Sequence, residues 1–255
     1  MKGIVHLVGA GPGAPDLLTV RAARLLGEAD IVFHDALASH EVLSLAARAE
    51  KIAVGKRCGA HSTAQRFINR RLVEAARRYR TVVRLKGGDP MLFARAQEEI
   101  DALVAAGVTV EVVPGVTAAL AAAAELRISL TRRGVSRSVV FATPRAGEGE
   151  SRSRWAQAVR AGDTAVLYMA AGDAPEVLRA LREAGVRCDV PVAIAENLSL
   201  PQETIAAGTL DELPMLAERR AGGPAVVLIG EVFRAMAAAQ AAAGRRKARA
   251  ASHSA

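Results

Sequence analysis

The chain has 255 residues, of which 51% are hydrophobic and 24% charged, so it can bury one or two apolar cores without metals or disulfides. Its two cysteines, Cys58 and Cys188, lie far apart and belong to no Cys/His cluster, which argues against a zinc motif or a disulfide framework and favours a reducing cytoplasm. Of the net charge of +8, four cations lie in residues 236–255 without any acid, which leaves +4 for the rest, and the 3% aromatic content disfavours single-strand nucleic-acid binding.

Residues 1–114 alternate short β-branched runs with helical stretches rich in Ala, Leu and Arg, the pattern of an α/β domain with a mainly parallel sheet. The first apolar run, residues 4–8, is too short for a signal peptide or a membrane span. The predicted strands are 4–8, 31–34, 52–54, 82–85 and 109–113, and the predicted helices are 19–28, 41–49, 63–78 and 94–106.

Pro114-Gly115 breaks the chain and is the expected boundary to a second α/β domain, residues 115–235. Its predicted strands are 138–142, 165–168, 192–195, 203–207 and 225–229, and its helices include 176–184. The Ala-rich basic tail, residues 236–255, has no apolar stripe and is expected to be a frayed helix that ends in disorder.

A glycine-rich loop, Gly9-Ala10-Gly11-Pro12-Gly13, directly follows the first predicted strand. Glycines there form a tight turn or let a ligand approach the backbone closely. A dinucleotide site is one interpretation, since Asp35 ends the second strand where a ribose-binding acid would lie. Pro12 and Pro15 weaken it, because each removes a backbone N–H that a pyrophosphate needs. The loop therefore suits a ligand without phosphates.

Two more turns follow predicted strands: Gly87-Gly88-Asp89-Pro90 comes after residues 82–85, and Pro114-Gly115-Val116-Thr117-Ala118 comes after residues 109–113. Either one alone would be explained as an ordinary β-turn. Ligands of open α/β sheets gather beyond the carboxyl ends of the strands. Three such loops together therefore predict one ligand-binding cleft.

Asp35 and Lys56 follow neighbouring predicted strands among polar and glycine residues. Each is either a surface charge or, in a cleft, a candidate for proton transfer. Several basic residues are candidates for contacts with anions, although some belong to solvated helix faces. These residues are Arg21, Arg24, Arg57, Arg66, Arg84, Lys86, Arg132 and Arg133.

From Val5 to about Val232 the chain resembles the tetrapyrrole methylases, and within that family the uroporphyrinogen-III C-methyltransferases. The resemblance rests on the first glycine loop with Leu17-Leu18-Thr19, on Ala29-Asp30-Ile31-Val32 with Asp35, and on Val83-Arg84-Leu85-Lys86-Gly87-Gly88-Asp89-Pro90. The segment Val54-Gly55-Lys56-Arg57, with His61-Ser62, Gln65 and Ile68-Asn69, points to the uroporphyrinogen enzymes in particular.

The resemblance implies two α/β domains with the cofactor cleft between them, a homodimer, and no metal. The implied reaction transfers methyl groups from S-adenosylmethionine to C2 and C7 of uroporphyrinogen III and gives precorrin-2, for sirohaem or cobalamin synthesis. Asp35 matches the family's proton acceptor and Lys56 its proton donor. The cofactor contacts fall on Pro12, Gly87, Gly88, Asp89, Leu92, Thr117, Ala118, Met169, Leu198 and Ala225. The carboxylate-rich substrate would account for the basic excess without nucleic acid or membrane partners.

The second half departs from the family pattern at several positions. Ile128-Ser129 lacks the usual proline, Arg132 replaces a histidine, and Ala142-Thr143-Pro144 replaces a Thr-Gly-His-like triplet. Leu198 stands where glycine is usual, and its branched side chain is expected to crowd the cofactor or to displace the loop.

Three alternatives remain beside the uroporphyrinogen enzyme. A methylase of a later corrin intermediate would keep the cofactor loops but would not need the segment from Lys56 to Asn69. A degenerate protein that binds the cofactor or a porphyrinogen without efficient turnover fits the departures. An NAD-dependent oxidoreductase is disfavoured by Pro12 and Pro15.

Overall fold

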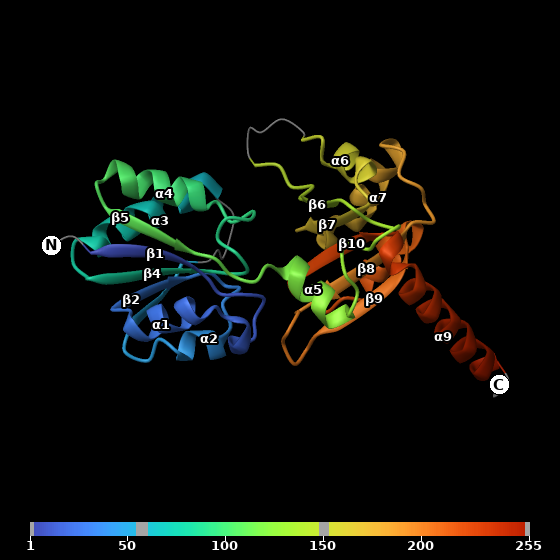
Figure 1. Cartoon of the computed structure of the whole chain (residues 1–255), viewed down its shortest axis with the longest axis horizontal. Helices are drawn as coiled ribbons and strands as arrows, with labels where there is room; N and C mark the ends of the chain where they lie inside the picture. Colours follow the sequence, from blue (N-terminus) through green and yellow to red (C-terminus); the bar gives the residue numbers. More distant parts are fainter. Residues whose placement is uncertain (1–2, 55–60, 148–152, 253–255) are drawn as a thin grey trace. The chain divides into compact units, whose positions relative to one another are not determined.

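The computed structural model describes residues 3–54, 61–147 and 153–252. The chain divides into two compact units, residues 1–121 and 122–255. Within the described residues, each unit is built on one five-stranded sheet with helices beside it (Figure 1). The two α/β domains predicted from the sequence are therefore confirmed.

The first sheet is parallel throughout its described strands and has the order β3-β2-β4-β1-β5. In its register, Val8 lies opposite both Leu85 and Val113. All five carboxyl ends therefore meet at one edge of the sheet, where ligands of open α/β folds bind. The strands are β1 (Ile4–Gly9), β2 (Ile31–His34), β3 (Glu50–Ala53), β4 (Thr81–Lys86) and β5 (Thr109–Val113).

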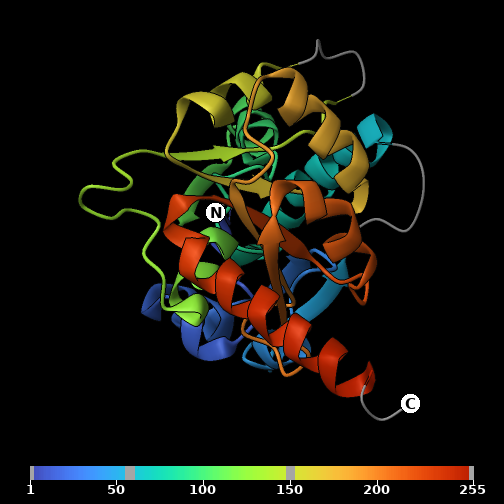
Figure 2. The ribbon, with the colours of Figure 1, turned by 90° about the vertical axis from the view of Figure 1, so that its right-hand side faces the viewer.

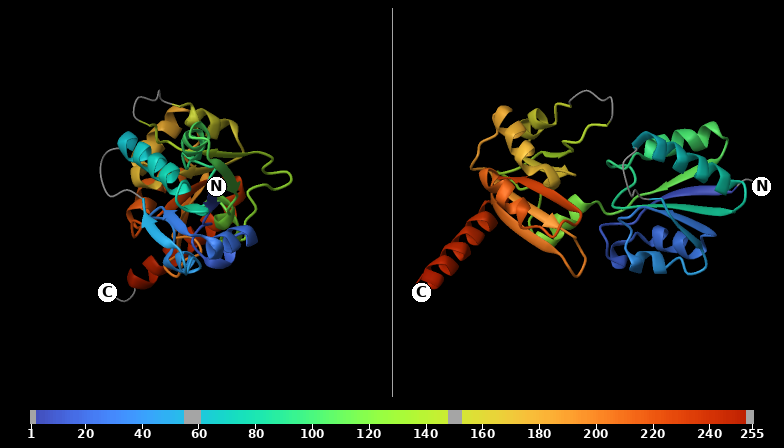
Figure 3. Two further views of the ribbon diagram at one scale, coloured as in Figure 1. Left: turned by 90° about the vertical axis from the view of Figure 1, so that its left-hand side faces the viewer. Right: turned by 180° about the vertical axis from the view of Figure 1, so that it is seen from behind.

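Helices cover both faces of this sheet, and alternation along β4 shows which side chains meet which helices. Val83 and Leu85 belong to the apolar cluster that includes α1 (Val20–Glu28) and α2 (His40–Ser44). Val82 belongs to the opposite cluster, with α3 (His61–Ala76) and α4 (Ala96–Ala105). The two helical layers are visible in Figure 1 and, from behind, in the right-hand view of Figure 3.

Helix α1 begins where the sequence predicts it. The Thr19 hydroxyl caps the helix by accepting a hydrogen bond from the Ala22 N–H at 3.2 Å. Leu25 and Leu26 are buried against the sheet, whereas Val20 is 88% exposed. The short 3-10 turn η1 (Pro15–Leu17) precedes the cap. Thr19 thus fixes the point at which the segment that follows the glycine-rich loop enters α1.

The second sheet is mixed and has the order β6-β7-β10-β8-β9. β6 and β7 are parallel, whereas β10 is antiparallel to both β7 and β8, and β9 is antiparallel to β8. The carboxyl ends of β7 and β8 therefore lie at the same edge as the start of β10. The strands are β6 (Val139–Ala142), β7 (Thr164–Tyr168), β8 (Pro191–Glu196), β9 (Thr204–Thr209) and β10 (Ala225–Gly230).

One apolar cluster holds the second unit together. It joins β7, β8 and β10 to helices α6, α7 and α8 through fully buried residues such as Leu167, Leu181 and Leu213. The helical segments from the unit boundary onward are α5 (Ala118–Leu126), α6 (Trp155–Ala161), η2 (Ala171–Asp173), α7 (Ala174–Glu183), η3 (Leu210–Glu212), α8 (Leu213–Glu218), η4 (Glu231–Phe233) and α9 (Arg234–Ser252).

Helix α9 packs against β9 and β8 through its first half, where Ala237 is buried and Gln240 Oε1 accepts a hydrogen bond from the Ala207 N–H at 2.6 Å. The helix continues to Ser252 and extends toward the C-terminus in Figure 2. The sequence predicts a frayed helix that ends in disorder for residues 236–255, and the structure is helical from Arg234 through Ser252. The high helix propensity of alanine favours this helix.

Candidate active site

Three loops meet beyond the carboxyl ends of neighbouring strands in the first unit. The loops after β1 and β4 pair through their backbones: Gly88 N–H donates to Gly11 O at 2.8 Å, and Gly11 N–H donates to Gly88 O at 3.2 Å. Both glycines have positive φ, +70° at Gly11 and +64° at Gly88, which side chains rarely tolerate. The glycine pattern in the sequence thus reflects a paired two-loop structure.

The loop after β5 packs directly on these two. A Cβ on Gly9 would lie 2.6 Å from Gly115 Cα, and a Cβ on Gly115 would lie 2.3 Å from Gly88 O. Because these obstacles are backbone atoms, no side-chain movement can relieve them. Glycine at these positions therefore permits the three loops to assemble.

Asp89 ties the assembly together through its carboxylate. Its Oδ2 accepts a hydrogen bond from the Gly115 N–H at 3.0 Å, and its Oδ1 accepts one from the Met91 N–H at 2.8 Å. The side chain thus joins the loop after β4 to the loop after β5. The contact of Asp89 with the cofactor stays a prediction. The two hydrogen bonds show that Asp89 also stabilises the loop assembly.

The other cofactor residues predicted in the first unit lie in the same loops. Gly87 packs against Leu37, since a Cβ there would lie 2.7 Å from Leu37 Cβ. Thr117 is buried just before α5, and Ala118 is the first residue of that helix. Pro12 and Leu92 are half-buried in the loops after β1 and β4.

The three cofactor residues predicted in the second unit gather at one edge of its sheet. Met169 follows β7, Leu198 follows β8, and Ala225 begins β10. The register places Tyr168 opposite Val226 and Glu196 opposite Ala225, which brings these ends together. The contacts of all three with the cofactor remain predictions.

The backbone at this edge is strained. Met169, Asn197 and Ser199 have φ values of 57°, 53° and 62°, in the left-handed region that costs energy for residues other than glycine. Leu198, expected to crowd the cofactor or to displace the loop, is 5% exposed and lies between two such residues. Strain of this kind is typical of ligand-binding loops.

Asp35 lies directly after β2, in the first unit. Its N–H donates to Leu85 O at 3.3 Å, and its Oδ1 accepts a hydrogen bond from Arg84 Nη2 at 2.5 Å. The side chain is 28% exposed, so a substrate can reach it. Lys56, the predicted proton donor, lies outside the described residues.

Asp35 contacts a buried group of polar and charged side chains, and together they form what we call the Glu99 network: Asp35, Arg84, Lys86, Glu99 and Gln65. Arg84 and Lys86 occupy alternate positions of β4 and therefore share the face covered by α3 and α4. Glu99 Oε1, on α4, accepts from Arg84 Nε at 3.1 Å, from Lys86 Nζ at 2.9 Å and from Gln65 Nε2 at 3.2 Å. Glu99 is fully buried.

The Glu99 network corrects one expectation. Arg84 and Lys86 were candidates for anion contacts, but both are only 2% exposed and bind Glu99 instead. Strand alternation turns them toward the helices rather than toward solvent. Burial lowers the pKa of Lys86, and Arg84 lowers it further, while Glu99 opposes both. The other anion candidates that the structure describes are exposed: Arg21, Arg24, Arg66, Arg132 and Arg133.

Glu99 has no role in the sequence prediction, and Gln65 enters it only through the resemblance. A glutamate in the first turn of a helix is ordinarily a solvated residue that favours the helix dipole. The sequence signal that points to a buried acid is the pair Arg84 and Lys86 in a strand that is otherwise largely apolar, because buried cations require an acidic partner.

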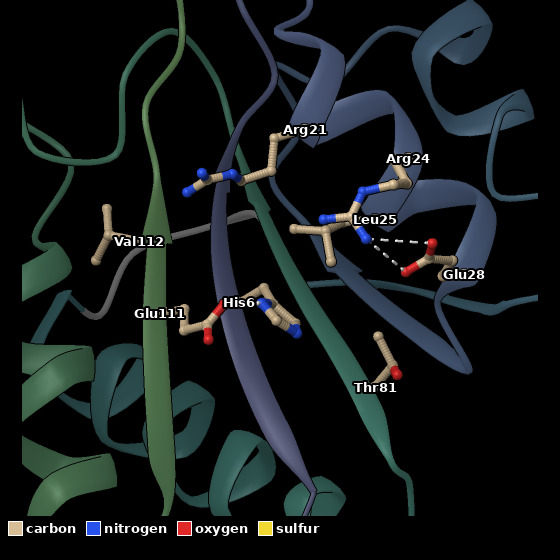
Figure 4. Close-up of a pocket in the computed structure, with 8 residues that line it drawn as sticks. All are labelled: His6, Arg21, Arg24, Leu25, Glu28, Thr81, Glu111 and Val112. Carbon is tan, nitrogen blue, oxygen red and sulfur yellow. Dashed lines mark hydrogen bonds and ion pairs between the residues drawn. The ribbon is translucent and has the colours of Figure 1, made fainter.

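A separate cavity of about 600 Å³ lies in the first unit, beside β1, β4 and β5 and next to α1 (Figure 4). His6 forms part of its lining, and its Nδ1 lies 3.2 Å from Glu111 Oε2. Arg24 pairs with Glu28 at 3.4 Å. Burial lowers the pKa of His6. With Arg21 and Arg24 balanced by two glutamates, the cavity has no strong charge preference, and none of the residues that line it belongs to the three loops.

Among the described residues, no group of three or more His, Cys, Asp or Glu side chains is placed to hold a metal ion. No helix in the same part of the chain is long and apolar enough to cross a membrane. In the first unit, the described part of the candidate site consists of the three glycine-bearing loops and the partly exposed carboxylate of Asp35.

A sequence model of the family described as Tetrapyrrole (Corrin/Porphyrin) Methylases matches residues 5–214. The chain belongs to the tetrapyrrole methylases. The family predicted from the strand-end motifs is thereby confirmed, and the NAD-dependent alternative is not retained.

Curated relatives include the sirohaem synthases of Zymomonas mobilis, 46% identical over 232 residues, and of Azotobacter vinelandii, 44% identical over 234 residues. Each alignment covers 91% of this chain but 49% and 50%, respectively, of the relative. The chain therefore spans about half the length of the curated relatives that it matches.

Solved structures match over nearly the whole tetrapyrrole methylase chain. The native uroporphyrin III C-methyl transferase of Thermus thermophilus is 38% identical, with a TM-score of 0.80, and the match covers 91% of this chain and 100% of that one. The same enzyme complexed with S-adenosyl homocysteine gives a TM-score of 0.78 at 37% identity. A cobalt precorrin-4 methyltransferase is 26% identical, with a TM-score of 0.79, and the match covers 90% of this chain and 95% of that one.

Proposed function

We propose that this methylase transfers methyl groups from S-adenosylmethionine to C2 and C7 of uroporphyrinogen III and produces precorrin-2. The observation that carries the proposal is the match to the Thermus uroporphyrin III C-methyl transferase over 100% of that enzyme's length, at 38% identity. The related structure with S-adenosyl homocysteine supports S-adenosylmethionine as the methyl donor.

The loops of the first unit fit such a cofactor. The close packing of Gly9, Gly88 and Gly115 keeps side chains away from the backbone at the ends of β1, β4 and β5. Pro12 and Pro15 remove N–H donors that a phosphate would need, whereas a nucleoside with a sulfonium group needs none. The strained loops at Met169 and Leu198 supply a second set of contacts in this proposal.

The chain's own residues would chiefly align the substrate and move protons. S-adenosylmethionine, when bound, supplies an electrophilic methyl group on sulfur. The pyrrole β-carbons C2 and C7 of a porphyrinogen are already electron-rich, so an in-line approach to the methyl group accounts for much of the rate. In this proposal the new carbon–carbon bond forms as the bond from sulfur to the methyl group breaks and S-adenosyl homocysteine leaves, and Asp35 accepts the one proton that each methylated ring loses in net. A proton that Lys56 donates while the ring tautomerises is matched by a second proton lost from the ring, and exposed arginines contact the substrate carboxylates.

The direct test incubates the purified protein with methyl-labelled S-adenosylmethionine and enzymically prepared uroporphyrinogen III under anaerobic conditions. We expect label in a product with the absorption and mass of precorrin-2. Boiled protein and uroporphyrinogen-free mixtures are the controls. Binding of S-adenosyl homocysteine without any labelled tetrapyrrole would contradict the proposal and favour a degenerate binding protein.

The second candidate function is methylation of a later corrin intermediate, and the observation that favours it is the 26% identity to a cobalt precorrin-4 methyltransferase. A parallel incubation with such a corrin intermediate tests this function. Transfer to the corrin but not to uroporphyrinogen III would overturn our assignment. Transfer to uroporphyrinogen III alone would support it.

We also propose that the enzyme is a cytoplasmic homodimer that uses no metal, as the family resemblance implies. The widely separated cysteines support a reducing compartment. Light scattering tests the oligomeric state, and an unchanged rate in the presence of a chelator would support metal independence. A monomeric mass at the concentration of the assay would contradict the dimer.

A further inference from the structure

We propose that Arg84 is a positioning residue that fixes the Asp35 carboxylate for proton transfer. This inference rests on the proposed function, in which Asp35 is the proton acceptor. All three guanidinium nitrogens of Arg84 are engaged: Nε donates to Glu99 Oε1 at 3.1 Å, Nη1 to Leu85 O at 3.1 Å and Nη2 to Asp35 Oδ1 at 2.5 Å.

The guanidinium is anchored on the side away from Asp35. Glu99 is completely buried, and its Oε1 also accepts from Lys86 and Gln65, so the carboxylate that holds Arg84 is itself fixed. Gln65 lies on α3 and so ties the network to that helix, and it also donates to Asn69 Oδ1, one turn further along, at 3.0 Å. A planar fork bound at three nitrogens has little freedom to rotate.

The Leu85 carbonyl connects the anchor to the backbone of Asp35. It accepts both the Arg84 Nη1–H and the Asp35 N–H, the latter at 3.3 Å. Asp35 is thus held at its main chain and at Oδ1, while its side chain remains 28% exposed. Catalytic groups work when their neighbours keep them within about 0.5 Å of the productive position. Arg84 is placed to supply such a restraint to a base that a substrate can still reach.

A buried ion pair that serves only folding is the competing explanation. The two differ in how the effects of mutations combine. If Arg84 acts through Asp35, then its replacement matters only while Asp35 is present. If Arg84 serves folding alone, then its replacement lowers the rate by the same factor in either background.

The test is a double-mutant cycle of Arg84→Met and Asp35→Asn in the whole 255-residue chain, with kcat and KM measured for both substrates. We expect Asp35→Asn and Arg84→Met each to lower kcat by about tenfold to a hundredfold, with KM for S-adenosylmethionine changed less than about twofold. In the Asp35→Asn background, Arg84→Met should cost less than about a further threefold. Arg84→Lys, which keeps the charge but not the fork, should be intermediate.

Leu103→Ala is the matched control, because Leu103 is fully buried on α4 one turn beyond Glu99 and contacts the apolar cluster instead of the charges. It should lower the melting temperature, and any loss of rate should be the same with Asp35 or Asn at position 35. If Arg84→Met does not fold, then Glu99→Gln, which loosens the anchor, takes its place in the cycle.

The outcomes separate the two proposals. A wild-type rate for Asp35→Asn would remove Asp35 from the proposed mechanism, and the positioning role with it. A slow Asp35→Asn with additive losses from Arg84→Met would overturn the positioning role alone. Crystal structures give a readout independent of turnover: we expect one Asp35 rotamer in the wild type and several in Arg84→Met, and an unchanged single rotamer would contradict the inference.

Discussion

Lys86 carries a buried charge, and its burial is unfavourable to the charged form. Its side chain is 2% exposed, and its pKa lies below the ordinary value of 10.5 because of burial first and of Arg84 second. Glu99 and Asp35 oppose this shift without reversing its direction. The folded chain therefore releases the Lys86 proton at a lower pH than the unfolded chain does.

This difference predicts a pH-dependent stability. Between the lowered folded pKa and 10.5, the unfolded state binds more protons than the folded state, so the contribution of Lys86 to the free energy of unfolding rises with pH. Relative to Lys86→Met, which lacks that contribution, the wild type should gain stability as pH is raised toward 10.5.

Urea denaturation of both proteins at several pH values, from about pH 8 upward, measures this difference. Lys51→Met, at an exposed position of β3, is the control and should show no such trend relative to the wild type. A difference between the wild type and Lys86→Met that stays constant or shrinks across this range would contradict the assignment.

At the scale of the elements, the packing of the three loops limits which residues they can contain. Gly115→Ala would place a Cβ 2.3 Å from Gly88 O and 2.9 Å from Gly9 Cα. We expect the loops to separate, with a stability loss of about 1–3 kcal/mol and weaker binding of S-adenosyl homocysteine by about tenfold or more.

Thermal unfolding and isothermal titration calorimetry measure the two effects. The matched control is Gly27→Ala, because a Cβ at Gly27 of α1 meets nothing within 4 Å. That change should leave binding unaltered and stabilise the helix slightly. Equal binding by Gly115→Ala and the wild type would show that the loop assembly does not form the cofactor site.

Several elements could be predicted closely because local signals define them. Thr19 caps α1, and turns with glycine or proline follow β1, β4 and β5. Helix α2 is shorter than its predicted range of residues 41–49, since it ends at Ser44. The chain then turns through the bonds from Ala46 N–H to Leu43 O and from Ala49 N–H to Ala46 O, which bury both alanines. An alanine-rich sequence does not distinguish such turns from helix.

The Glu99 network could not be predicted in the same way. Arg84 and Glu99 are separated by fifteen positions and come from a strand and a helix, so only the crossing of α4 over the sheet brings them together. The predicted site residues share strand ends, which a parallel sheet gathers at one edge regardless of packing detail. Residues that support a site from behind depend on side-chain packing, for which the sequence carries no comparable local pattern.

At the scale of the whole molecule, the two units follow different rules. The first sheet is parallel, and helices connect its strands, as its alternating pattern predicts. In the second, the antiparallel pairing of β8, β9 and β10 depends on connections whose direction the periodicity does not encode. The predicted boundary at residue 114 lies close to the division at residue 121 and stays a prediction.

Helix α9 offers a test at this scale. A chain that ends after Ala243 keeps Ala237 and Gln240, which contact the second unit, whereas a chain that ends after Phe233 loses both. We expect the longer form to retain the wild-type melting temperature and methyl-transfer rate, and the shorter form to melt at a lower temperature because it loses buried apolar area. Scanning fluorimetry compares them, and identical melting curves would contradict the docking role.

The hydrogen bond from the Ala207 N–H to Gln240 Oε1 lies on the outer edge of the second sheet. β9 is an edge strand, and an edge strand with unpaired N–H groups is a template on which another chain can add a strand. Gln240 occupies one of those groups, and α9 lies against the strand. Beyond its part in packing, the helix therefore covers part of an edge on which another chain could add a strand.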